Sequence, residues 1–278
     1  IDSMFVARIG EDALTAVSLV YPLQTLVVSI SVGFGVGINA AVAFFLGAGE
    51  KENADRSAAQ GLLLSLLHGA LLSVGGFLCI PYFLPLFTSD ARILDWGMEY
   101  AYIVLSFSMV ITVQIAFEKI YQAVGNMLVP MVCMAAGCIT NIILDPVFIF
   151  GLGPIPRLEV KGAAIATVIG QVVTLILYLI WYFCKDMGLS LGRRNMKLTG
   201  EICGKLYTVG VPCSLTMGLP SLLITVLNGF AAAFSPVYIL ILGVYFKLQS
   251  FIYLPANGIV QGMRPILSYN YGAGDQKR

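Results

Sequence analysis

Charged side chains are scarce in this chain of 278 residues. Only 11% of the residues are Asp, Glu, Lys or Arg, whereas 58% are hydrophobic and the mean hydropathy is +0.88. Soluble domains carry about 25% charged residues. So few charges cannot cover a water-soluble particle of this size, and lipid must therefore contact much of the surface. The net charge of +1 gives no reason to expect nucleic acid as a partner.

Patterns typical of metal centres, disulfide frameworks and enzymes are missing as well. The chain has one histidine and six cysteines, and the cysteines are scattered, mostly inside apolar runs, without a CxxC spacing. We expect them to be small buried thiols. No nucleophile–base pair is visible, so we do not expect an enzyme. The chain begins at Ile1 without Met or a signal peptide, which we interpret as a fragment of a longer protein.

Long apolar runs occupy most of the sequence. A helix needs about 20 apolar residues to cross a bilayer, whereas an open sheet edge in lipid would leave backbone groups unpaired. The predicted fold class is therefore all-α, a polytopic membrane helix bundle. We predict a partial span at 1–8 and full spans near 13–45, 57–87, 93–122, 127–150, 160–184, 202–230 and 236–270.

Basic residues gather in alternate connections, those that follow the second, fourth, sixth and eighth spans. The positive-inside rule places these connections in the cytoplasm, including the region 185–205. The polar segment Lys185–Gly200 is the longest loop. We therefore predict a six-helix bundle over 1–190 and the start of a second bundle over 191–278. The basic residues concerned are Lys51, Arg56, Lys119, Lys185, Arg193, Arg194, Lys197, Lys205, Lys277 and Arg278.

An internal repeat appears at an offset of 225 residues, which aligns LGAGE at 46–50 with YGAGD at 271–275. The same offset pairs Gln24 with Gln249, and it pairs two GxxxG motifs, at 33–37 and 258–262. Both copies run from outside to inside, which predicts parallel repeats about an axis along the membrane normal. Coincidence among glycine-rich helices is the alternative.

Asp145 lies in an apolar run, where a carboxylate at mid-bilayer costs about 2.5–3.5 kcal/mol. Asn141 precedes it by four residues and shares its helix face. Pro146 lacks an N–H and should free the carbonyl of Ile142. These groups are hard oxygen donors suited to Na⁺ or to a proton. The alternative is a structural kink with Asp145 paired to a neighbouring helix.

Other polar residues within the spans allow two interpretations each. Lys247 could repel or replace a cation in the second bundle, or it could form a buried ion pair or extend its ammonium to the membrane interface. Gln24 and Gln249 could line a central cleft, or they could bond across helices. We expect Glu118 and Lys119 to form a solvated pair at the end of their span.

Four segments in order resemble the multidrug and toxic compound extrusion (MATE) family, most of all its bacterial multidrug-efflux members. DSMFVARIG at 2–10 with ALTAVS at 13–18 resembles the first helix end and second helix start. NIILDP at 141–146 resembles the fifth-helix motif, and GAAIAT at 162–167 the sixth. The segment 264–274 resembles the end of the eighth helix.

The resemblance implies a two-lobe fold whose second lobe is incomplete here, because most of the first helix and the last four helices would be missing. It implies a monomer in the plasma membrane that exports amphipathic or cationic drugs in exchange for H⁺ or Na⁺, with no further cofactor. In similar members a cation site uses residues that match Asp2, Asn141, Asp145 and Thr167. A lipid-linked precursor flippase and a non-transporting scaffold are the alternatives.

Two residues of this implied site also have plainer interpretations. Asp2 could be a solvated terminus, and the hydroxyl of Thr167 could bond its own helix backbone.

The charge pattern makes a direct prediction about topology. In a cysteine-free background of the complete protein, a cysteine in place of Asn195 should resist an impermeant thiol reagent in whole cells, because the surrounding loop carries the largest excess of Lys and Arg. Rapid labelling from outside would reverse the predicted orientation.

Overall fold

The computed structural model describes residues 2–151, 156–234 and 236–275, with only part of the side chains between 221 and 250. The described chain is all-α and contains no strand, as predicted. Its α-helices are α1 (Asp2–Val6), α2 (Glu11–Gly47), α3 (Lys51–Phe83), α4 (Ala91–Ser106), α5 (Ser108–Ala123), α6 (Leu128–Phe150), α7 (Glu159–Cys184), α8 (Gly200–Phe234) and α9 (Pro236–Gly272), with short 3-10 turns at Leu84–Leu86 and Arg193–Met196.

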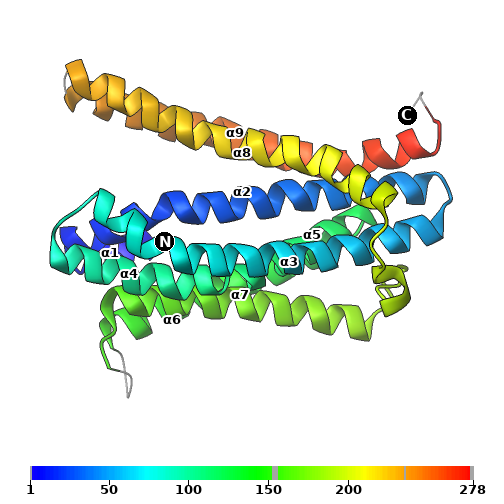
Figure 1. Cartoon of the computed structure of the whole chain (residues 1–278), viewed down its shortest axis with the longest axis horizontal. Coiled ribbons are helices and arrows are strands. Elements are labelled where there is room, and N and C mark those ends of the chain that lie inside the picture. Colours follow the sequence, from blue (N-terminus) through cyan, green and yellow to red (C-terminus); the bar gives the residue numbers. More distant parts are fainter. Residues whose placement is uncertain (1, 152–155, 235, 276–278) are drawn as a thin grey trace.

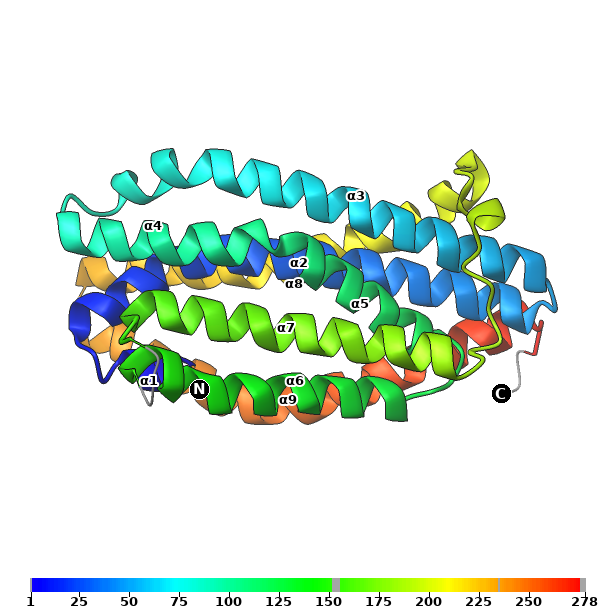
Figure 2. The ribbon, with the colours of Figure 1, turned by 90° about the horizontal axis from the view of Figure 1, so that it is seen from below.

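The helices lie lengthwise beside one another, with α8 and α9 along one side of α2 (Figures 1 and 2). We call the end where α2 ends at Gly47 and α3 begins at Lys51 the basic end, because the connection 185–199 also lies there. In Figure 1, α8 and α9 approach α2 at the basic end and diverge from it toward the opposite end.

The predicted spans correspond to the helices, and one of them is bent. In the described part of the chain, four helices are long and apolar enough to cross a membrane, or five if the bent pair α4–α5 counts as one span. The single span expected over 93–122 corresponds to α4 and α5 together, which meet at a bend of 44°. The hydroxyl of Ser108 donates to the carbonyl of Leu105 at 2.7 Å, and such side-chain bonds compete with the helical ladder and bend helices.

Small residues allow α2 to approach α8 and α9 closely. Gly37 lies against the backbone of α8, whereas Gly262 has no neighbour within 4 Å of a potential Cβ. At the basic end, Gly47 meets the carbonyl of Tyr269, and Gly272 meets the carbonyl of Phe44. These two contacts are related by the offset of 225 found in the sequence. Reciprocal contacts of this kind are what a two-fold repeat produces, and α2 and α9 run in the same direction, as the parallel repeat predicts (Figure 1).

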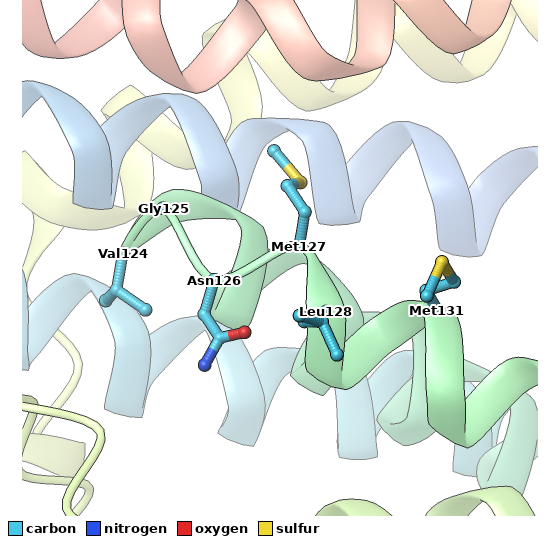
Figure 3. Close-up of a pocket in the computed structure, with 6 residues that line it drawn as sticks. All are labelled: Val124, Gly125, Asn126, Met127, Leu128 and Met131. Carbon is cyan, nitrogen blue, oxygen red and sulfur yellow. The ribbon is translucent and has the colours of Figure 1, made fainter.

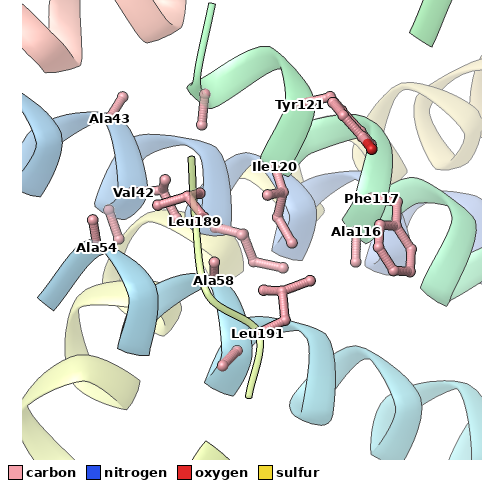
Figure 4. Packing of buried hydrophobic residues seen from close by; sticks show 14 of the residues in the cluster. Val42, Ala43, Ala54, Ala58, Ala116, Phe117, Ile120, Tyr121, Leu189 and Leu191 are labelled. Carbon is pink, nitrogen blue, oxygen red and sulfur yellow. The ribbon is translucent and has the colours of Figure 1, made fainter. Parts of the chain in front are cut away.

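The connection between α7 and α8 is held against the bundle, although most of its residues are polar. Leu189 and Leu191 are buried at the basic end against side chains of α2, α3 and α5 (Figure 4). The carboxylate of Asp55 accepts a hydrogen bond from the backbone N–H of Ser190 at 2.9 Å. The connection therefore packs against the larger group of helices before the chain enters α8.

The close packing of α6 on α7 requires glycine at position 162, because there is no room for a side chain there. A Cβ at this position would lie 2.6 Å from the carbonyl of Phe148, whereas a Cβ at Gly75 on α3 would have no neighbour within 4 Å. Gly162→Ala should therefore lower the free energy of unfolding by about 1–3 kcal/mol. The matched control Gly75→Ala should be neutral or stabilising by up to about 1 kcal/mol, because Ala favours helix. Thermal unfolding of both variants in detergent checks this, and equal shifts would contradict it.

Candidate functional site

Asp145 is a fully buried carboxyl group on α6. The side-chain amide of Asn141 donates to Asp145 Oδ1 at 3.2 Å, so the predicted pairing on one helix face is confirmed. Asp145 Oδ2 has no hydrogen-bond partner among the described residues. The helix continues through Pro146 to Phe150, and because Pro146 has no N–H, the carbonyl of Ile142 lacks its usual helical donor.

Asp2 approaches the same region from α1. The hydroxyl of Thr167 on α7 lies 2.8 Å from Asp2 Oδ2 and 2.9 Å from the carbonyl of Ala163. A hydroxyl has one proton, so Thr167 donates to one of these acceptors at a time. The hydroxyl of Thr167 thus lies within reach both of Asp2 and of its own helix backbone, the two partners considered from the sequence. Asp2 is half-buried rather than fully solvated.

Asp2 and Asp145 lie near enough to one another for their charges to interact, and the hydroxyl of Tyr100 lies near enough to both to be affected by their charges. Two ionised carboxylates at such a distance repel one another, and a shared proton or a bound cation relieves the repulsion. The donors offered are two carboxylates, one amide and one hydroxyl. These are hard oxygen ligands of the kind that suit Na⁺ better than a transition metal.

A cavity of about 200 Å³ adjoins these residues, and the amide oxygens of Gln114 and Gln171 are buried beside it without a hydrogen-bond partner in the described part of the chain. The sequence analysis did not select either glutamine, although an amide inside an apolar span was the available signal. Unpaired buried oxygens of this kind are ready to accept from water or from a polar ligand. The lining residues are Asp2, Gln114, Met134, Gly137, Cys138, Asn141, Thr167, Gly170, Gln171 and Thr174.

The remaining polar candidates fall in different places. Gln24 on α2 donates to the hydroxyl of Tyr100 on α4 at 3.3 Å, so the interpretation of a bond across helices is confirmed. Tyr100 was not selected from the sequence, yet it links Gln24 to the carboxyl pair. Gln249 is half-buried on α9 and does not line the cavity. The side chain of Lys247 lies outside the described residues.

The expectation that Glu118 and Lys119 form a solvated pair is wrong. Lys119 is only 2% exposed, because α5 continues for another turn beyond it and α2 packs against its side chain.

A second cavity, of about 720 Å³, lies at the connection between α5 and α6 (Figure 3). Its lining consists of Val124, Gly125, Asn126, Met127, Leu128 and Met131. None of these side chains is ionisable, so this cavity offers no group that could exchange a proton or bind a cation strongly.

Comparisons with known proteins agree on one family. The family model described as MatE matches residues 1–147. A protein named FAD transporter from Shewanella oneidensis is 26% identical over 278 residues, which cover 100% of this chain and 61% of that protein. The multidrug export protein MepA of Staphylococcus aureus is 28% identical over 270 residues, or 94% of this chain and 57% of that protein.

Solved structures give the same result. A transporter of the MOP superfamily from Pyrococcus furiosus superposes with a TM-score of 0.91 at 27% identity, over 99% of this chain and 60% of that one. A MATE structure described as in the straight conformation superposes with a TM-score of 0.92 at 28% identity, over 99% and 61%. The chain thus spans about 60% of the length of these relatives.

The neighbouring carboxyl groups predict a particular dependence of stability on pH and Na⁺. Without Na⁺, the folded pair should keep a proton that the unfolded chain has already lost, so the free energy of unfolding should fall by up to about 1.4 kcal/mol per pH unit and should level off once the pair has lost that proton. Added Na⁺ should restore part of the loss. In Asp145→Asn both effects should disappear. Thermal unfolding of the complete protein across pH, with Na⁺ or choline, checks this, and an Asp145→Asn profile equal to that of the wild type would contradict it.

Proposed function

Because this chain belongs to the MatE family, we propose that the complete protein is a secondary active antiporter. It would export amphipathic or cationic drugs in exchange for H⁺ or Na⁺. The observation that carries the proposal is the carboxyl pair of Asp2 and Asp145 inside an apolar bundle. The name of the MepA relative, a multidrug export protein, supports the substrate class.

The carboxyl pair supplies the coupling chemistry. A proton and a Na⁺ ion compete for the same oxygens, because each neutralises the repulsion between the two carboxylates. A cation shifts a conformational equilibrium only by the difference between its affinities for the two states. Coupling therefore requires that the distance between Asp2 and Asp145, or their access to water, changes between the outward-open and inward-open forms. Asp2 lies on α1 and Asp145 on α6, so a relative movement of these helices would change both.

Alternating access is supported by the way α8 and α9 meet α2. They are in contact at the basic end, and they diverge toward the opposite end (Figure 1). Apolar side chains are exposed there on both sides, including Tyr21 and Leu26 on α2 and Leu223 and Phe230 on α8. We propose that residues 1–190 and 191–278 belong to two bundles that rock about the α2 contact. With the basic end in the cytoplasm, the arrangement described here is open outward.

The membrane placement follows from the same proposal. The basic segments, including 185–205, would face the cytoplasm, and the carboxyl pair would lie in the outer half of the bundle, because α1 lies at the end opposite to the basic end (Figure 2). The protein would work as a monomer in the plasma membrane, with the lipid bilayer and small drug molecules as its partners.

Asp145→Asn tests the proposed coupling. The substitution keeps the size and most of the hydrogen bonding of the side chain and removes the exchangeable charge. In vesicles that contain the complete protein, it should abolish drug efflux driven by an imposed H⁺ or Na⁺ gradient, while the protein stays folded and inserted. Asn141→Ala should weaken efflux less, because it removes one neutral ligand. Full efflux by Asp145→Asn under either gradient would show that the carboxyl group is structural.

A further inference from the structure

Lys119 on α5 is a buried cation that the carboxyl site does not use. Its ammonium group donates to Glu118 Oε1 at 2.9 Å, to Gln122 Oε1 at 3.0 Å and to Gln261 Oε1 at 2.9 Å. An ammonium has three N–H donors, so all three are satisfied. Glu118 is also largely shielded, with its side chain 13% exposed. Burial without these partners would be costly, since a buried charge needs both pairing and hydrogen bonds.

The three acceptors do not come from the same group of helices. Glu118 and Gln122 belong to α5, as Lys119 does, whereas Gln261 belongs to α9. The backbone carbonyl of Lys119 accepts from Asn39 on α2 at 3.0 Å. Gly35 on α2 leaves room for the lysine stem, because a Cβ there would lie 2.9 Å from Lys119 Cγ. Lys119 therefore lies where α2, α5 and α9 meet, and among the described residues its contact with α9 is the hydrogen bond to Gln261.

Two more polar bridges cross from the larger group of helices to α8 and to the residue just before it. His68 Nε2 on α3 lies 2.8 Å from the hydroxyl of Tyr207, and the side chain of Gln60 accepts from the backbone N–H of Thr199 at 3.1 Å. Both lie on the half of the molecule toward the basic end, where Gly37 and Gly47 approach α8 and α9. Lys205 on α8 also places its ammonium over the ring of Phe45 on α2, 4.2 Å from the centroid. Among the described side-chain hydrogen bonds from the larger group of helices to α8 or α9, the bond from Lys119 to Gln261 is the one with a charged donor.

From this geometry we infer that the Lys119–Gln261 bond is a latch that holds the basic end closed. Opening of that end separates α9 from α5 and breaks the bond. The ion pair of Lys119 with Glu118 lies entirely on α5 and moves as a unit, so opening leaves no buried charge unpaired. Opening breaks one hydrogen bond from a charged donor to a neutral acceptor. A bond of this kind is strong enough to favour the closed form, yet its loss leaves the Lys119–Glu118 ion pair intact, so the end can open. This inference rests on the proposed alternating-access function.

The test measures opening directly in the complete protein. Spin labels replace Lys51 on α3 and Ala273 after α9, both exposed at the basic end, in a cysteine-free background in nanodiscs. Double electron–electron resonance then gives the populations of short and long distances between the labels. Gln261→Leu removes the acceptor on α9 and should raise the ratio of open to closed forms by about tenfold. The matched control Gln122→Leu removes an amide acceptor of the same ammonium on α5 and should leave the ratio near that of the wild type.

A second variant, at the same position, should change the ratio of open to closed forms in the opposite direction. Gln261→Glu converts the crossing bond into an ion pair and should lower the ratio of open to closed forms, whereas a merely structural role would give both Gln261 variants the same direction of change. If the wild type samples both distances and neither Gln261 variant shifts them, the latch is wrong while the proposed function stands. If the wild type shows one distance at every pH and Na⁺ concentration, alternating access fails and the latch fails with it.

Discussion

The proposed function depends on the repulsion between two carboxyl groups, those of Asp2 and Asp145, that lie close together inside an apolar bundle. The sequence has few charges, and most of them lie at helix ends or in connections, yet Asp2 and the fully buried Asp145 meet where lipid-facing helices surround them. In an apolar solvent such a pair persists only if a proton or a cation neutralises it. Three hydrogen bonds surround the two carboxyl groups. Thr167 donates to Asp2 and Asn141 donates to Asp145. Gln24 bonds the nearby hydroxyl of Tyr100. Occupancy of the pair and stability of the bundle are therefore linked.

The opposite half of the molecule is organised by close backbone contact. The contacts of Gly47 with Tyr269 and of Gly272 with Phe44 form a reciprocal pair at the basic end, and this is where we propose the pivot between the two groups of helices. Lys119, His68 and Gln60 add polar bridges around this pivot. In the proposed mechanism, ion occupancy at one end and closure at the other would act on the same helix, because Lys119 lies on α5 and the cavity beside the carboxyl pair is lined by Gln114 from α5.

Sequence reasoning predicted the parts of this arrangement that local spacing determines. The four-residue interval from Asn141 to Asp145 places both on one helix face, and the offset of 225 predicts the direction of α9 and the reciprocal glycine contacts. Sequence reasoning could not predict the bend at Phe107, because the bend accompanies a hydrogen bond from the Ser108 hydroxyl to the backbone carbonyl of Leu105 that spacing alone does not reveal. It was wrong about Lys119, because the position of a residue near the end of a span does not reveal which helix covers it. Tyr100, Gln114 and Gln171 were missed for the same reason, since their role arises from distant helices.

The central claim is that Asp2 and Asp145 share one exchangeable cation, and infrared difference spectroscopy of the complete protein tests it most directly. Titration from mildly acidic to alkaline pH without Na⁺ should remove the C=O stretching band of one protonated carboxyl group. Both Asp2→Asn and Asp145→Asn should eliminate that band, because each dissolves the pair, and added Na⁺ should displace the proton at a lower pH in the wild type. A carboxyl band that survives unchanged in both variants would contradict the account.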